Sequence, residues 1–132
     1  MSFDWTEFLR LARILQGGPE SQALRVTSET RVRCAFSRAY YAAFCYARNH
    51  ARDNMAFTPS GSGDDHWLVP DHYKNKRMPG IADTLKKLGG WRKQCDYDDA
   101  IPEPMYGAVG QANERAERLI ELLRRHSETA RR

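Results

Sequence analysis

The sequence lacks the features that mark a membrane-bound or secreted protein. In its 132 residues, no stretch approaches the roughly 18–20 consecutive apolar residues that a membrane-spanning helix needs. The N-terminus carries Asp4 and Glu7 where a signal peptide has basic residues followed by an apolar run. We therefore expect a cytoplasmic protein that does not act at a membrane.

Cysteine pairs, phosphate-binding loops and metal motifs are also missing. The three cysteines, Cys34, Cys45 and Cys95, are odd in number and widely spaced, which argues against a disulfide framework and a zinc ribbon. We expect three buried or half-buried thiols. No glycine-rich nucleotide loop and no His-Glu-x-x-His sequence occurs. The sequence therefore predicts no metal site and no cofactor.

Positive charge is in modest excess. The chain has 21 Lys and Arg against 17 Asp and Glu, a net charge of +4, and most of the cations are arginine. Arginine is the side chain best suited to bind phosphate and to form interface ion pairs. This balance permits a nucleic-acid partner without requiring one. With 41% hydrophobic residues, the chain has the composition of an ordinary folded domain.

Strand patterns are scarce, and helical periodicity dominates. Four segments with apolar residues at helical spacing predict helices over 3–16, 20–54, 80–95 and 105–129. Between Pro70 and Pro79 we expect at most a short helix, and loops at 57–65 and 96–104.

These segments predict an all-α fold, an antiparallel bundle of four to five helices around a long central helix. We expect a single domain over 1–132, with a core at about 3–125 and a frayed C-terminal tail.

The central helix carries the first candidate site residue. Its middle, CAFSRAYYAAFCYA at 34–47, sets five alanines among aromatic rings, which is typical of a helix at the centre of a bundle. Arg38 lies in this apolar stretch, where an unpaired charge is costly to bury. Its head therefore reaches solvent at a cleft, binds an external anion, or pairs with Asp96, Asp98 or Glu29.

Three segments together resemble the HEPN superfamily, in particular a small prokaryotic branch with an SRAYYAAFHAAR helix and a later R-x-x-A-D-Y motif. They are DWTEFLRLARIL at 4–15, SRAYYAAFCYAR at 37–48 and WRKQCDYDD at 91–99. The resemblance extends over about 4–123, and 37–44 is its most specific part. Cys45 stands where the branch often has histidine, and Cys95 where it often has alanine.

The resemblance implies an all-α domain that usually dimerises. Many such domains are metal-independent endoribonucleases, often toxins paired with a nucleotidyltransferase antitoxin or components of phage defence. Catalytic members use an Arg-x(4–6)-His motif from both subunits, in which arginine stabilises the phosphorane and histidine moves protons. Here the fifth residue after Arg92 is Tyr97, and a tyrosine with a pKa near ~10 is a poor base at neutral pH.

Two hypotheses follow. In the first, the chain is an RNA-directed protein, a metal-independent endoribonuclease whose motif lacks its usual histidine. Its predicted catalytic residues are Arg92, Asp96 and Tyr97, and its predicted substrate-binding residues are Arg38, Tyr41, His66 and Lys93.

In the second hypothesis, the chain is a non-catalytic module that binds nucleotide or RNA, or a nucleotidyltransferase-type partner. Both hypotheses expect a homodimer. A buried Arg92 paired with Asp96 or Asp98 favours the module. If Arg38 and Arg92 point together at water or an anion, the nuclease is favoured.

Overall fold

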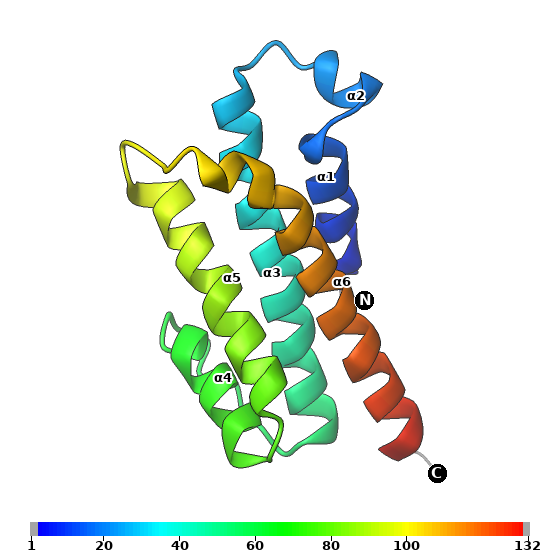
Figure 1. Ribbon diagram of the computed structural model, residues 1–132. Coiled ribbons are helices and arrows are strands. Elements are labelled where there is room, and N and C mark those ends of the chain that lie inside the picture. Colours follow the sequence, from blue (N-terminus) through cyan, green and yellow to red (C-terminus); the bar gives the residue numbers. More distant parts are fainter. Residues whose placement is uncertain (1–2, 131–132) are drawn as a thin grey trace.

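The computed structural model describes residues 3–130, and all regular structure in this part is helical. Six helices follow one another: α1 (Thr6–Gln16), α2 (Pro19–Gln22), α3 (Ser28–Asn54), α4 (Asp65–Asn75), α5 (Pro79–Tyr97) and α6 (Pro104–Ala130). In Figure 1, α3 runs through the middle of the molecule, antiparallel to α1 and α5, and α6 returns along its side. The predicted all-α bundle with a long central helix is confirmed. Within the described residues, no helix is long and apolar enough to cross a membrane.

The central helix begins later than its sequence pattern predicts. The expected uninterrupted helix over 20–54 is wrong, because α2 ends after one turn and α3 begins at Ser28. Thr27 is extended and caps α3, since its hydroxyl accepts a hydrogen bond from the N–H of Thr30. Arg31 then joins the two helices by donating to the hydroxyl of Ser21 at 2.6 Å.

α4 continues through Pro70, although the sequence predicts that this proline bounds the helix. The expectation that Pro70 bounds the helix is wrong, since α4 begins at Asp65 and continues to Asn75. Proline has no N–H to bond the preceding turn, which is unfavourable inside a helix. Burial of Val69, Pro70 and Tyr73 offsets this loss. The Tyr73 hydroxyl also donates to the carbonyl of Ala47 at 2.7 Å and ties α4 to α3.

Alanines of α3 let its neighbours approach closely. All five alanines between residues 34 and 47 are fully buried: Ala35, Ala39, Ala42, Ala43 and Ala47. Aromatic rings on the same helix fill the remaining space, and Phe36 meets the edge of Trp91 from α5 at 5.4 Å between ring centres. α3 is buried on several sides because α1, α4, α5 and α6 all pack against it.

Charged side chains of α6 pair in part within the helix and in part with α1. Glu121 binds both Arg124 and Arg125, and the Arg125 pair has the i,i+4 spacing that favours such contacts on a helix. Glu114 and Arg118 have the same spacing but form no salt bridge among the described residues. Glu117 instead reaches across to Arg13 of α1, which links the first and last helices.

We expect the substitution by alanine to have different effects at two adjacent glycines of α5. A Cβ at Gly90 meets nothing within 4 Å, so Gly90→Ala should stabilise the fold by up to about 1 kcal/mol through helix propensity. A Cβ at Gly89 would lie 3.2 Å from Cε1 of Tyr40, so Gly89→Ala should lose this gain by displacing that ring. Urea unfolding of the two variants checks the difference, and equal stabilisation would contradict it.

Candidate functional site

Arg92 lies near the C-terminal end of α5, and its side chain is only 7% exposed. Its guanidinium carbon is 5.3 Å from the ring centre of Tyr40 and 5.6 Å from that of Tyr41, both on α3. Among residues 3–130, one polar contact holds it, from Nη1 to the Oδ2 of Asp96 at 3.4 Å, and its buried Nε has no hydrogen-bond partner. Two aromatic rings and one long contact therefore hold a charge that is nearly out of water.

His66 reaches the same two tyrosines from α4. Its Nδ1 lies 2.5 Å from the hydroxyl of Tyr40, and its ring stacks on Phe44 at 4.6 Å between centres. It also meets Tyr41 edge-on at 6.0 Å. Arg92 and His66, 26 residues apart in sequence, therefore flank one pair of tyrosine rings. We call this group, with Arg38 and Asp96, the Arg92 cluster.

The electrostatics of the cluster keep His66 neutral. Burial lowers the pKa of His66 below its usual 6.5, and the positive charges of Arg92 and Lys93 lower it further, against the opposing effect of Asp65. Burial also raises the pKa of Tyr40, so its hydroxyl stays protonated near neutral pH. At pH 7 the site therefore combines a charged guanidinium with an uncharged imidazole.

Arg38 forms none of the internal ion pairs considered from the sequence. Within the described residues it makes no contact with Asp96, Asp98 or Glu29 that qualifies as a salt bridge, and its one hydrogen bond goes to the hydroxyl of Ser37 at 3.2 Å. Its guanidinium carbon lies 4.5 Å from the ring centre of Phe8 and 5.4 Å from that of Tyr41. Arg38 and Arg92 thus both lie against the Tyr41 ring, and Arg38 keeps most of its donors free.

Two predicted residues lie at the edge of the cluster. Tyr97 is 76% exposed, with its ring centre 5.9 Å from the guanidinium carbon of Arg92. Lys93 is also exposed. The structure thus gathers Arg38, Tyr41, His66, Arg92 and Asp96, with Tyr97 and Lys93 at the rim. The sequence does not distinguish Tyr40 and Phe44, which hold His66, from core residues, because an aromatic side chain in an apolar stretch indicates a core position.

The surroundings of Arg92 and Arg38 do not all favour the same hypothesis. Arg92 is buried and paired with Asp96, which favours the non-catalytic module. In the part of the chain that the structure describes, this contact is single and long and Nε has no partner. Arg38, which has no salt bridge there, lies against the Tyr41 ring that Arg92 also contacts, and these features favour a site. A buried pair kept only for stability normally satisfies more of its donors.

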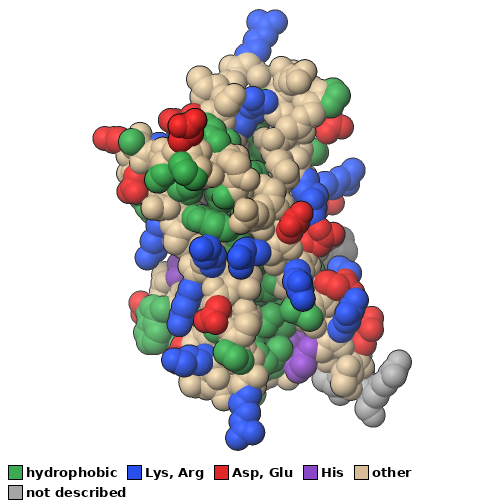
Figure 2. All heavy atoms as spheres, viewed as in Figure 1, with side chains coloured by type: hydrophobic (Ala, Val, Ile, Leu, Met, Phe, Trp, Pro, Cys, Tyr) green, Lys and Arg blue, Asp and Glu red, His purple; other side chains and the backbone are tan. Residues whose placement is uncertain are grey.

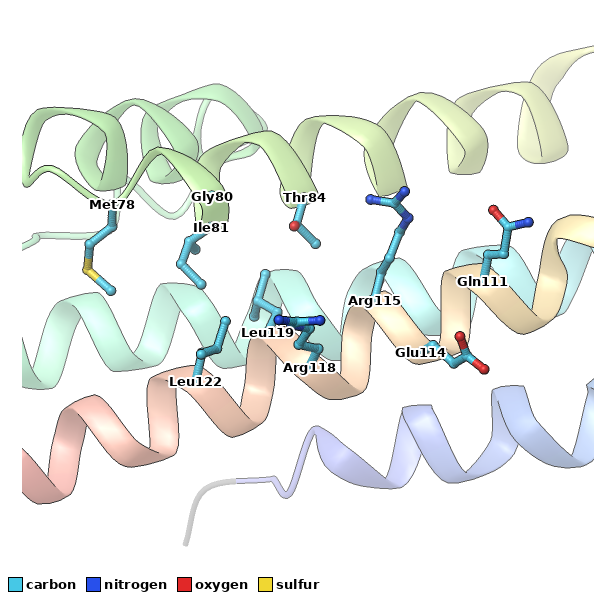
Figure 3. A pocket seen from close by; sticks show the side chains of 10 residues that line it. All are labelled: Met78, Gly80, Ile81, Thr84, Gln111, Glu114, Arg115, Arg118, Leu119 and Leu122. Carbon is cyan, nitrogen blue, oxygen red and sulfur yellow. The ribbon is translucent and has the colours of Figure 1, made fainter.

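A groove of about 730 Å³ lies between α5 and α6. Its lining includes the apolar side chains of Ile81, Leu119 and Leu122. Figure 3 shows Arg115 and Arg118 of α6 beside it, and neither forms a salt bridge within the described residues. In Figure 2, apolar surface and positively charged side chains (Lys and Arg) lie close together along the middle of this face. Apolar area next to unpaired charge is typical of an interaction surface.

No protein-family model matches the chain, and comparisons with curated proteins and with solved structures find no match. The resemblance to HEPN domains therefore stays an inference from the residues quoted above.

Removing one charge should change the titration of His66. In Lys93→Ala, the pKa of His66 should rise toward its ordinary value, because a positive charge that disfavours the imidazolium is gone. The matched control is Lys86→Ala, which removes an exposed lysine of the same helix that is not among the causes of the shift. NMR titration of the His66 ring measures both, and equal pKa values in the two variants would contradict the electrostatic account.

Proposed function

We propose that this chain is an RNA-directed HEPN-type protein, a metal-independent endoribonuclease in which His66 takes the place of the histidine that its Arg-x4-Tyr motif lacks. The observation that supports this proposal is the meeting of Arg92 and His66 at Tyr40. A neutral imidazole beside a fixed guanidinium supplies the two functions that phosphodiester cleavage by a ribose hydroxyl requires, a base and a positive charge.

The proposed reaction starts at the ribose 2′-hydroxyl. When the Nδ1–H of His66 donates to the Tyr40 oxygen, its Nε2 holds a lone pair that removes the 2′ proton. The 2′ oxygen bonds to the adjacent phosphorus and the P–O5′ bond breaks, which leaves a 2′,3′-cyclic phosphate. The 5′ oxygen takes a proton from water, and His66 returns its proton to solvent. Arg92 stabilises the negative charge on the phosphorane.

The other residues of the cluster have supporting roles in this proposal. Asp96 orients Arg92, and Tyr97 donates a hydrogen bond to the phosphate from the rim. Arg38 binds a neighbouring phosphate, and Lys93 adds positive charge that attracts RNA. Tyr41 holds both guanidinium groups against its ring and so keeps Arg38 and Arg92 next to each other.

Cleavage of end-labelled tRNA by the purified protein in EDTA tests the proposal. We expect products with 2′,3′-cyclic phosphate and 5′-hydroxyl ends, and no cleavage where the nucleotide 5′ to the scissile phosphate is 2′-deoxy. Cleavage that requires a divalent metal, or that persists at the deoxy position, would contradict the mechanism.

The second candidate is the non-catalytic module, which the buried Arg92–Asp96 contact favours. In this case RNA or nucleotide binds without being cleaved, or a nucleotidyltransferase-type partner docks, for which the groove between α5 and α6 is the candidate surface. Binding of labelled tRNA with no cleavage at high protein concentration would support this candidate over the nuclease.

Location and assembly are part of the proposal. We infer a cytoplasmic homodimer, supported by the family resemblance and by exposed apolar side chains such as Val26 and Trp67. Light scattering on the purified protein measures the mass directly, and a monomer at assay concentration would contradict the dimer.

A further inference from the structure

A groove of about 610 Å³ opens beside the Arg92 cluster, between α1, α3 and α5. Its volume is within the range of about 300–1,000 Å³ that is typical of small-molecule sites. Two leucines of α1 line it together with residues of α3 and α5: Leu11, Leu15, Thr30, Arg33, Cys34, Ser37, Arg38, Cys95 and Asp96.

The groove and the Arg92 cluster share two charged residues. Arg38 lines the groove and lies against Tyr41, and its one hydrogen bond within the described residues leaves most of its donors free. Asp96 lines the groove with its side chain 30% exposed, and within the same residues only its Oδ2 contacts Arg92. Each residue therefore has bonding capacity left for a ligand in the groove. Arg33 does not, since its guanidinium donates to the carbonyls of Cys95, Asp98 and Asp99.

We propose that this groove binds the guanine base of an RNA nucleotide whose phosphate lies on Arg38. The proposal rests on the proposed function, because it names the base that this site accepts. Leu11 and Leu15 present apolar surface to the face of the base, and Asp96 accepts hydrogen bonds from its edge.

The chemistry of Asp96 selects guanine among the four bases. An ionised carboxylate only accepts hydrogen bonds, and guanine presents two adjacent donors, N1–H and the N2 amino group. Adenine and cytosine have a ring nitrogen that accepts hydrogen bonds next to their single amino group. This nitrogen would face a carboxylate oxygen, and two acceptors repel each other. Uracil offers one N–H between two carbonyl oxygens. A bidentate pair of this kind should favour guanine by about tenfold or more.

The exposed thiol of Cys34 reports on the groove. The expectation that all three thiols are buried or half-buried is wrong, because Cys34 is exposed while Cys45 and Cys95 are buried. Burial raises the pKa of both inner thiols, to about 11 for Cys95, which lowers their reactivity. Alkylation of the native protein therefore occurs at Cys34, on the wall of the groove.

The experiment measures the rate at which iodoacetamide alkylates Cys34 in the presence of each of the four nucleoside 3′-monophosphates, or of inorganic phosphate. We expect half-protection by the guanosine nucleotide at a concentration about tenfold or more below the others. Phosphate alone should not protect. In Asp96→Asn, the ratio between guanosine and adenosine nucleotides should fall to about one or below, because an amide has one acceptor and one donor and so matches adenine at least as well as guanine.

A matched pair of variants locates the protection. Leu11→Trp fills the groove, and Leu24→Trp adds the same ring at a position of similar exposure, 44% against 42%, that does not line the groove. Binding of the guanosine nucleotide, measured by calorimetry, should weaken at least about tenfold in Leu11→Trp and remain unchanged in Leu24→Trp.

These measurements distinguish failure of the guanine groove from failure of the proposed nuclease activity. Equal protection by all four nucleotides overturns the guanine assignment. No protection by any of them, in a preparation that cleaves tRNA in EDTA, overturns the groove proposal and leaves the nuclease standing. Guanosine protection without tRNA cleavage supports the groove as a nucleotide site and contradicts the nuclease.

Discussion

Replacing Arg92 by glutamine should lower the rate of RNA cleavage by about 100- to 1,000-fold. Glutamine keeps a polar side chain near Tyr40 but removes the positive charge that would meet the phosphorane, and the loss of one such donor typically has an effect of this size. Single-turnover cleavage of end-labelled RNA in EDTA measures the change.

Two comparisons separate this effect from misfolding and from loss of net charge. Arg25→Gln removes an exposed arginine that lies outside the cluster, and its cleavage rate should stay within about twofold of the wild type. The circular dichroism spectrum of Arg92→Gln should match that of the wild type. A folded Arg92→Gln variant that cleaves at the wild-type rate would exclude Arg92 from catalysis.

Phe36→Ala should destabilise the fold by about 3–5 kcal/mol, since the side chain is 1% exposed and its removal leaves a cavity in the core. This is a large part of the roughly 5–15 kcal/mol that such domains have in total. The ring joins α3 to α5 through Trp91, so its loss also loosens the contact between the helices that carry Tyr40 and Arg92.

Urea unfolding measures the loss for Phe36→Ala. The neighbouring Cys34→Ala is the control, because Cys34 is exposed and a surface substitution usually changes stability by less than about 0.5 kcal/mol. A loss below about 1 kcal/mol for Phe36→Ala would show that this ring does not pack as described.

Helical periodicity was enough to predict the bundle and the central position of α3. It failed where one local contact overrides the pattern. The hydroxyl of Thr27 begins α3 eight residues after the predicted start at residue 20, and packing around Pro70 and Tyr73 continues α4 through a proline. Neither contact changes the apolar spacing, so periodicity does not detect it.

The site was predictable in part. Arg92, Asp96 and Tyr97 lie within one segment, and their proximity follows from helical spacing. The meeting of His66 with Arg92 depends on how α4 packs against α3 and α5, which spacing along the chain does not reveal. The role of Tyr40 likewise requires the tertiary structure, because its hydroxyl acts on a residue 26 positions away.

His66 is the proton carrier of the proposed reaction, and chemical rescue tests this role most directly. His66→Ala removes a half-buried imidazole that contacts Tyr40 and Phe44, and it should lower cleavage of end-labelled tRNA in EDTA by about 100-fold or more. Added imidazole should restore part of the lost rate, and the restored rate should rise with the concentration of neutral imidazole. A folded His66→Ala variant that cleaves as well as the wild type, or one that imidazole does not rescue while the wild type is active, would contradict the account.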